Sequence, residues 1–173
     1  PLKYALFAAL TLLSSNTYSD DKAFNQLVDK TIAVYGGAAL IKQHSALRES
    51  GSTFSNSQNR SGSVLRAYQY PDRFHIEIHY EGAQTESRIL NGDKAWKDGR
   101  PAMPPMRAAI LLQATRIDLP RVLVERRGQV RDLGEIKAED GKPRHAVEIP
   151  LDGDMKVIAE IDPGNGHILK SRG

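Results

Sequence analysis

The chain has 173 residues, of which 40% are hydrophobic and 26% charged. This length and composition predict one globular, soluble domain with a single sizeable core, and they exclude a disordered chain. The 24 basic and 21 acidic residues leave a net charge of +3, and the signs alternate along the chain. Because no basic block is interleaved with aromatic residues, we expect no nucleic-acid partner.

Residues 1–19 have the pattern of a secretory signal peptide or its remnant. Lys3 precedes an apolar run at residues 4–13, and small polar residues follow it. The run is too short to cross a bilayer, which takes about 20 apolar residues. The chain has no cysteine, so neither a disulfide nor a lipidated cysteine is expected. We therefore expect an exported periplasmic protein without a lipid anchor, and the alternative for this segment is a buried first helix.

Two helices are expected next. Asp20 and Asp21 suit a helix start, because their oxygens accept hydrogen bonds from free backbone N–H groups. Apolar residues recur at helical spacing up to Gly36 and Gly37, which favour the left-handed conformation that ends a helix. A second, shorter helix is expected at residues 38–44.

Residues 47–97 alternate between polar and apolar side chains, as in successive strands joined by tight turns. Residues 74–80, FHIEIHY, are the clearest strand. One face carries Phe74, Ile76, Ile78 and Tyr80, and the other carries His75, Glu77 and His79. Short connections, such as the Asn91-Gly92 turn, require neighbouring strands to be antiparallel.

A helical insertion at residues 101–131 interrupts the strands, and its start is rich in proline. Residues 132–173 return to strand patterns with turns at Asp152-Gly153 and Asn165-Gly166. The sequence therefore predicts an α+β fold with about 8 to 11 antiparallel strands. Such a sheet curls strongly, so its apolar concave face must be covered by the predicted helices.

Four phrases carry a resemblance to a known family: YGG at residues 35–37, PDRFHIEI at 71–78, NGDKAW at 91–96 and IDPGNGHI at 161–168. In this order they resemble the LolA/LolB superfamily of periplasmic lipoprotein carriers. The resemblance implies one domain at residues 20–173, an incomplete, half-open antiparallel β-barrel wrapped around a helical lid. It also implies a hydrophobic cavity that accepts acyl chains. Only 6% of the residues are aromatic, so a cavity that is aliphatic, smaller or suited to another ligand is expected.

We accordingly interpret the chain as a periplasmic binding or carrier protein for a lipid or for lipoprotein acyl chains, without covalent chemistry. Membrane-associated donor and acceptor proteins are the expected partners. No motif matches a functional residue of those carriers, so the candidate lining is chosen from the apolar strand and lid faces. It comprises Tyr68, Phe74, Ile76, Ile78, Tyr80, Ile89, Trp96, Met106, Ile110 and Leu111. Ordinary core packing is the alternative for each of them.

Two other functions stay open: a sensory or regulatory lipid- or protein-binding module of the same fold, and a hydrolase with an unrecognised site. The histidines of the clearest strand do not favour an enzyme. His75 and His79 lie about 13 Å apart on a regular strand, too far to share one metal ion. No nucleophile elbow, phosphate loop or HExxH motif is present. We expect no cofactor, no metal and no catalytic residue.

Positive charge gathers in and after the helical insertion. The residues are Arg107, Arg116, Arg121, Arg126, Arg127 and Arg131. They either form the solvated face of amphipathic helices or meet acidic headgroups or an acidic partner, in which case salt should weaken the association.

Overall fold

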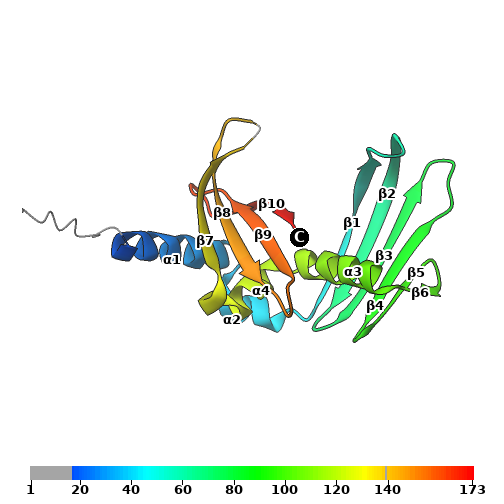
Figure 1. Ribbon diagram of the computed structural model, residues 1–173, viewed down its shortest axis with the longest axis horizontal. Coiled ribbons are helices and arrows are strands. Elements are labelled where there is room, and N and C mark those ends of the chain that lie inside the picture. The colour runs from blue at the N-terminus through cyan, green and yellow to red at the C-terminus, as the bar shows by residue number, and fades with distance from the viewer. Residues whose placement is uncertain (1–16, 139) are drawn as a thin grey trace, which may run out of the picture.

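The computed structural model describes residues 17–138 and 140–173 (Figure 1). The fold is α+β, as predicted, with helices and antiparallel strands. The helices are α1 (Thr17–Val34), α2 (Gly37–Gln43), α3 (Pro104–Ile117) and α4 (Leu119–Glu125), followed by the short 3-10 helix η1 (Arg127–Gln129). Residues 1–16 of the expected signal segment lie outside the described residues, and residues 17–19 belong to α1.

The first two helices follow the predicted pattern with a shifted start. Within the described residues α1 already includes Thr17, three residues before the expected aspartates. It ends at Val34, because Gly36 adopts a left-handed φ of 98° that a helix cannot continue. The second helix then begins at Gly37. No helix among residues 17–138 and 140–173 is long and apolar enough to cross a membrane.

Residues 46–101 form a six-stranded antiparallel meander, which we call sheet A. Its strands follow one another in chain order. They are β1 (Ala46–Ser55), β2 (Arg60–Gln69), β3 (Arg73–Tyr80), β4 (Glu86–Asn91), β5 (Lys94–Lys97) and β6 (Arg100–Pro101). Strands β1 to β5 span residues 46–97, where successive strands were predicted, whereas the two-residue β6 was not predicted.

Residues 131–172 form a second antiparallel sheet, which we call sheet B. Its order is β10-β9-β8-β7. The strands are β7 (Arg131–Lys137), β8 (Pro143–Pro150), β9 (Lys156–Ile161) and β10 (Ile168–Arg172). Its outer face carries ion pairs, such as Glu148 with Arg131 and Lys156. Glu148 is itself buried, and the two cations neutralise its carboxylate from more exposed positions.

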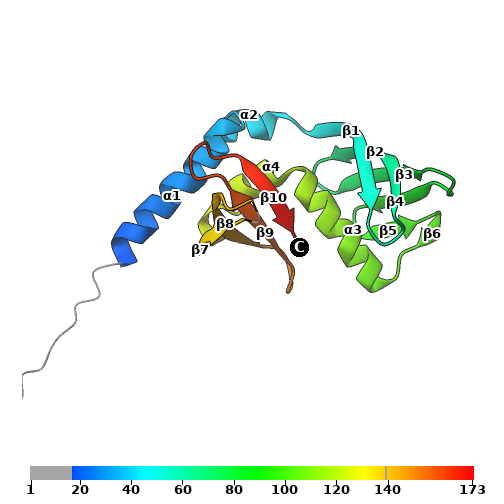
Figure 2. The same ribbon diagram turned by 90° about the horizontal axis from the view of Figure 1, so that it is seen from above.

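The ten strands fall within the predicted number, but they form two separate sheets where one curled sheet was expected (Figures 1 and 2). Neither sheet closes into a barrel. The expectation of a single core was also wrong, since each sheet has its own cluster of buried side chains. The chain crosses between the sheets through α3 and α4, and no strand of one sheet is paired with the other.

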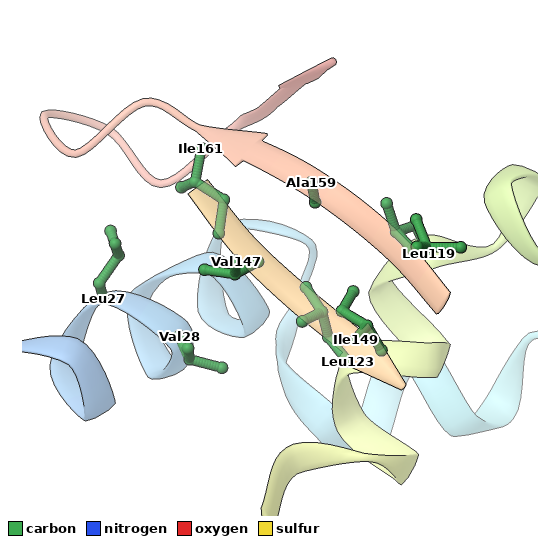
Figure 3. Packing of buried hydrophobic residues seen from close by; sticks show 9 residues of the cluster. Leu27, Val28, Leu119, Leu123, Val147, Ile149, Ala159 and Ile161 are labelled. Atoms are coloured by element: carbon green, nitrogen blue, oxygen red, sulfur yellow. The ribbon is translucent and has the colours of Figure 1, made fainter. Parts of the chain in front are cut away.

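Sheet B is covered by α1 and α4. Figure 3 shows Leu27 and Val28 of α1 and Leu123 of α4 pointing toward the side chains of β8 and β9. The buried members of this cluster are Leu27, Val28, Leu119, Leu123, Val147, Ile149, Val157, Ala159 and Ile161. The leading helix and the insertion were expected to cover one sheet together, but the apolar residues of α1 pack on sheet B.

Sheet A is covered by α3, which runs across its inner face (Figures 1 and 2). Ile110 of α3 is completely buried there, and Ala114 lies one turn further along. The buried strand residues of this cluster are Tyr68, Phe74, Ile76, Ile78, Leu90 and Ala95. One helix therefore carries most of the packing of the larger sheet.

Candidate ligand-binding cleft

Eight of the ten residues predicted to line a cavity gather in the cluster between sheet A and α3. They are Tyr68, Phe74, Ile76, Ile78, Tyr80, Met106, Ile110 and Leu111. The strand members do share one face, and His75, Glu77 and His79 lie on the other, as predicted. However, these eight side chains pack against one another, so most of the predicted lining is core.

Ile89 and Trp96 lie apart from the other eight, on the outer face of sheet A. The pairing register decides this: Phe74 stands opposite Leu90, and Leu90 stands opposite Ala95. Ile89 and Trp96 are therefore opposite each other on the face that also carries His75. Both positions have an apolar neighbour in sequence, Leu90 and Ala95, and in each case it is the neighbour that points inward.

A cleft lies between β1 of sheet A and β10 of sheet B. It has a volume of about 630 Å³, and the junction of α3 with α4 and the end of α2 complete its walls. Its apolar lining consists of Ile41, Leu47, Ile117, Leu119, Ile168 and Leu169. Leu47 and Leu169 remain 37% and 51% exposed, so apolar surface faces this space without a protein partner covering it.

Polar groups occupy one side of this cleft. The Nη2 atom of Arg66 on β2 forms a 2.7 Å ion pair with Oε1 of Glu49 on β1. Arg116, in the last turn of α3, donates only a long 3.4 Å hydrogen bond, from Nη1 to the Ser171 carbonyl. The cleft is thus amphipathic, with an apolar wall and a basic wall.

A smaller pocket of about 280 Å³ opens behind the basic wall. Arg66, Arg116 and Ser171 line both spaces, and Ile76 and Gln113 complete the smaller one. We call this space the inner pocket. Because three residues are shared, the cleft and the inner pocket adjoin each other.

Arg121 of α4 fixes the helical wall beside the cleft. Its side chain is almost fully buried, and its Nε pairs with Asp118 Oδ2 at 2.7 Å. Nη2 donates to the carbonyls of Ile41 and His44, and thereby ties the C-terminal end of α2 to α4. The guanidinium also lies 4.6 Å from the ring centre of Tyr70.

Tyr68 stands behind this junction. Its hydroxyl donates to the Pro71 carbonyl at 2.9 Å. Burial, with smaller contributions from Asp118 and Glu125, raises the pKa of Tyr68 to about 12. The folded protein therefore favours the neutral phenol of Tyr68 over the phenolate. Next to it, Glu125 raises the pKa of the Tyr70 hydroxyl, chiefly through a hydrogen bond.

A hollow of about 590 Å³ is bordered by α1 and sheet B and includes Phe24, Leu27 and His145. Two further hollows lie closer to sheet A. One, of about 370 Å³, lies on the other side of α3 and includes Tyr68, Leu111 and Arg121. The other is a groove of about 570 Å³ in sheet A that includes His75 and Ile89. Within the described part of the chain, none of the ten predicted lining residues borders the 630 Å³ cleft.

The histidines of β3 do not form a metal site. Glu77 lies between them, with Oε1 3.4 Å from His75 Nε2 and Oε2 3.7 Å from His79 Nε2. All three side chains are exposed on the outer face of sheet A. Across residues 17–138 and 140–173 no group of three or more potential ligands could hold a metal ion.

The basic residues of the insertion are largely neutralised. Arg121, Arg126, Arg127 and Arg131 each pair with a carboxylate, and Arg107 donates to the Asp93 carbonyl. Neither Arg107 nor Arg116 has a carboxylate of the described residues within ion-pair distance, and only Arg116 of these two borders the cleft. Of the basic cluster seen in the sequence, Arg116 is therefore the guanidinium that faces the cleft without an ion pair among the described residues.

Sequence reasoning missed the cleft because its lining comes from the ends of elements that are far apart in the chain. Leu47 begins a strand, Ile117 ends a helix and Ile168 begins the last strand. The only available signal was that exposed leucines occur at strand positions 47 and 169.

Comparisons with protein families, with curated proteins and with solved structures gave no match for this chain.

Proposed function

We propose that this protein binds a lipophilic ligand, a lipid or the acyl chains of a lipoprotein, in the cleft between β1 and β10. In this proposal sheets A and B act as the two walls of a half-open barrel, and α3 and α4 form its helical cover. The protein carries the ligand between membrane-associated donor and acceptor proteins in the periplasm and performs no covalent chemistry on it. This is the function that the resemblance to LolA/LolB-like carriers implies.

The cleft itself is the observation that supports this proposal. Its volume of about 630 Å³ lies within the range of small-ligand sites, which is roughly 300 to 1,000 Å³. Six apolar residues from five different elements face it, so an acyl chain placed there leaves water on several sides. Each buried methylene contributes about 0.8 kcal/mol, and a chain of a dozen methylenes supplies enough free energy without precise polar contacts.

The binding site in this proposal differs from the lining expected from the sequence. The eight clustered residues of sheet A support the walls, whereas the ligand contacts residues such as Leu47, Ile117 and Leu169. Ile110 is no longer a suitable test position, because it is completely buried and its replacement perturbs the fold.

Equilibrium binding of monopalmitoylglycerol, measured below its micelle concentration, tests the proposal. Leu47→Asp and Leu169→Asp place a charge on the apolar wall at positions that are already exposed, so both variants should fold. We expect each to weaken binding about tenfold or more, because the acyl chain loses an apolar contact and desolvates a carboxylate.

Leu133→Asp is the matched control, since Leu133 of β7 is 46% exposed and lies outside the cleft. This variant should bind like the unmodified protein. Native mass spectrometry of protein taken from its own periplasm should also detect a co-purifying lipid mass. Absence of lipid binding by the unmodified protein, or equal losses in all three variants, would overturn the proposed function.

A further inference from the structure

We propose that the inner pocket formed by Arg66, Gln113 and Arg116 binds the anionic headgroup of an amphiphile, a phosphate or a carboxylate, while the acyl chain occupies the adjoining cleft. This inference rests on the proposed function and specifies its ligand. The ligand is then a lipid with a negative charge close to its acyl chain.

Unsatisfied polar atoms in the inner pocket are the first observation. Arg66 Nε and Gln113 Oε1 are buried and have no hydrogen-bond partner in the described residues. Both residues line the 280 Å³ pocket. Buried polar atoms without partners are rare and costly, so a pocket holding two of them fits a ligand that supplies the missing partners.

The donor set of the pocket favours an anion. Arg66 Nε and the guanidinium of Arg116 present N–H groups, and a guanidinium can only donate. The Gln113 side chain offers an NH₂ group in place of its oxygen when the amide rotates by half a turn. Gln113 and Arg116 are three residues apart on α3, so they lie on neighbouring positions of one helix face.

Charge is the second observation. Glu49 neutralises Arg66 across the β1–β2 pair, but among the described residues Arg116 has only the distant Ser171 carbonyl. Lys170 adds a further cation to the lining of the cleft. A half-buried guanidinium without a counter-ion is stabilised by an anionic oxygen, which forms shorter and stronger hydrogen bonds than a neutral acceptor.

The inner pocket adjoins the apolar cleft, and this favours an amphiphile over a free anion as the ligand. Arg66, Arg116 and Ser171 border the inner pocket on one side and the cleft on the other. A headgroup held by the two arginines therefore has its attached chain directed past the apolar residues of the cleft, such as Ile117 and Leu47. A free anion would use only the inner pocket.

Two lipids that differ in one phosphate provide the test: palmitoyl lysophosphatidic acid and monopalmitoylglycerol, with inorganic phosphate as the free anion. The unmodified protein is expected to bind the phosphorylated lipid about tenfold more tightly than the neutral one. In Arg116→Gln this preference should vanish, so that the two lipids have nearly equal dissociation constants. Arg116→Lys should keep part of the preference, because the charge remains.

Arg107→Gln is the matched control: it removes the same charge from the same helix, and Arg107 lines neither the cleft nor the inner pocket. It should keep the full preference. Circular dichroism and urea unfolding of the variants show that the fold is retained.

The possible failures can be told apart. Equal affinity of the unmodified protein for both lipids overturns the headgroup site but leaves the proposed function standing. Binding of neither lipid overturns the proposed function, and this inference with it. Inorganic phosphate that binds as tightly as the phosphorylated lipid overturns the amphiphile and leaves a free-anion site, and a loss in Arg107→Gln equal to that in Arg116→Gln overturns the role of the pocket.

Discussion

The two sheets differ in how completely their helices cover them. Seven side chains of the sheet B cluster have no exposed surface, because α1 and α4 both pack on this four-stranded sheet. In the sheet A cluster only Ile110 is completely buried, although this sheet has six strands. One helix is too little cover for the larger sheet.

From this difference we expect the sheet B half to contribute more to stability and the sheet A half more to ligand binding. The sheet B cluster is more completely buried, so we expect this half to be the more rigid part of the fold. The inner pocket and the 370 Å³ hollow both border residues of the sheet A cluster, such as Ile76 and Leu111. Apolar surface that the helices leave uncovered is surface that a ligand can cover.

The largest expected effect comes from removing the contacts of Arg121, which connect α4 with α2. Arg121→Met keeps much of the side-chain volume but leaves the Asp118 carboxylate buried and unpaired. It also removes the donor to the carbonyls at the C-terminal end of α2. We expect a loss of about 3–5 kcal/mol of unfolding free energy, measured by urea denaturation.

The same experiment can follow the halves separately. Trp96, the only tryptophan of the chain, lies in sheet A, so its fluorescence follows that half while circular dichroism follows the whole chain. In Arg121→Met the fluorescence transition should precede the circular dichroism transition. Arg126→Met, which breaks the more exposed pair with Asp152, should cost less than about 1 kcal/mol. Similar losses in both variants would contradict the role given to Arg121.

Matched core truncations compare the two clusters directly. Leu123→Ala in the sheet B cluster and Ile110→Ala in the sheet A cluster each remove a completely buried aliphatic side chain. We expect about 4 kcal/mol for Leu123→Ala and about 2 kcal/mol for Ile110→Ala, because a single covering helix can move to fill the space. Urea unfolding measures both values, and an equal or reversed order would show that sheet A is packed as rigidly as sheet B.

The smallest effect is a dependence on alkaline pH that originates on the sheet A side. The pKa of Tyr68 is raised from 10.0 to about 12, so the folded state favours the neutral phenol. This stabilisation is complete below pH 10 and is lost as the pH rises to 12. The loss should be on the order of 2 kcal/mol, measured as urea unfolding at increasing pH.

Substitution of the tyrosine isolates this contribution. Tyr68→Phe should flatten the decline in unfolding free energy above pH 10, because the ionisable group is gone. Tyr80→Phe, from the same cluster, should leave the decline in place, since Tyr68 is still present. If the unfolding free energy of Tyr68→Phe falls as steeply above pH 10, the pH dependence does not come from Tyr68.

Much of the candidate site lay outside the reach of the sequence. The alternation in residues 74–80 correctly placed Phe74 and Ile76 on the inner face. Alternation failed at Ile89 and Trp96, because each has an apolar neighbour and only the register with β3 decides which one points inward. The cleft could not be predicted at all, since contacts between strand and helix ends depend on how the sheets are placed.

The sequence by itself determined the local elements of this protein. Periodicity, proline and glycine set the helices and nine of the ten strands, because these signals act between residues that are close in the chain. Only the tertiary structure decided that the strands divide into two sheets with separate cores, and that Arg116 lies without a counter-ion at the cleft between them. Those features depend on which helices pack on which sheet. Such contacts join residues that are far apart in the chain, so no local sequence pattern encodes them.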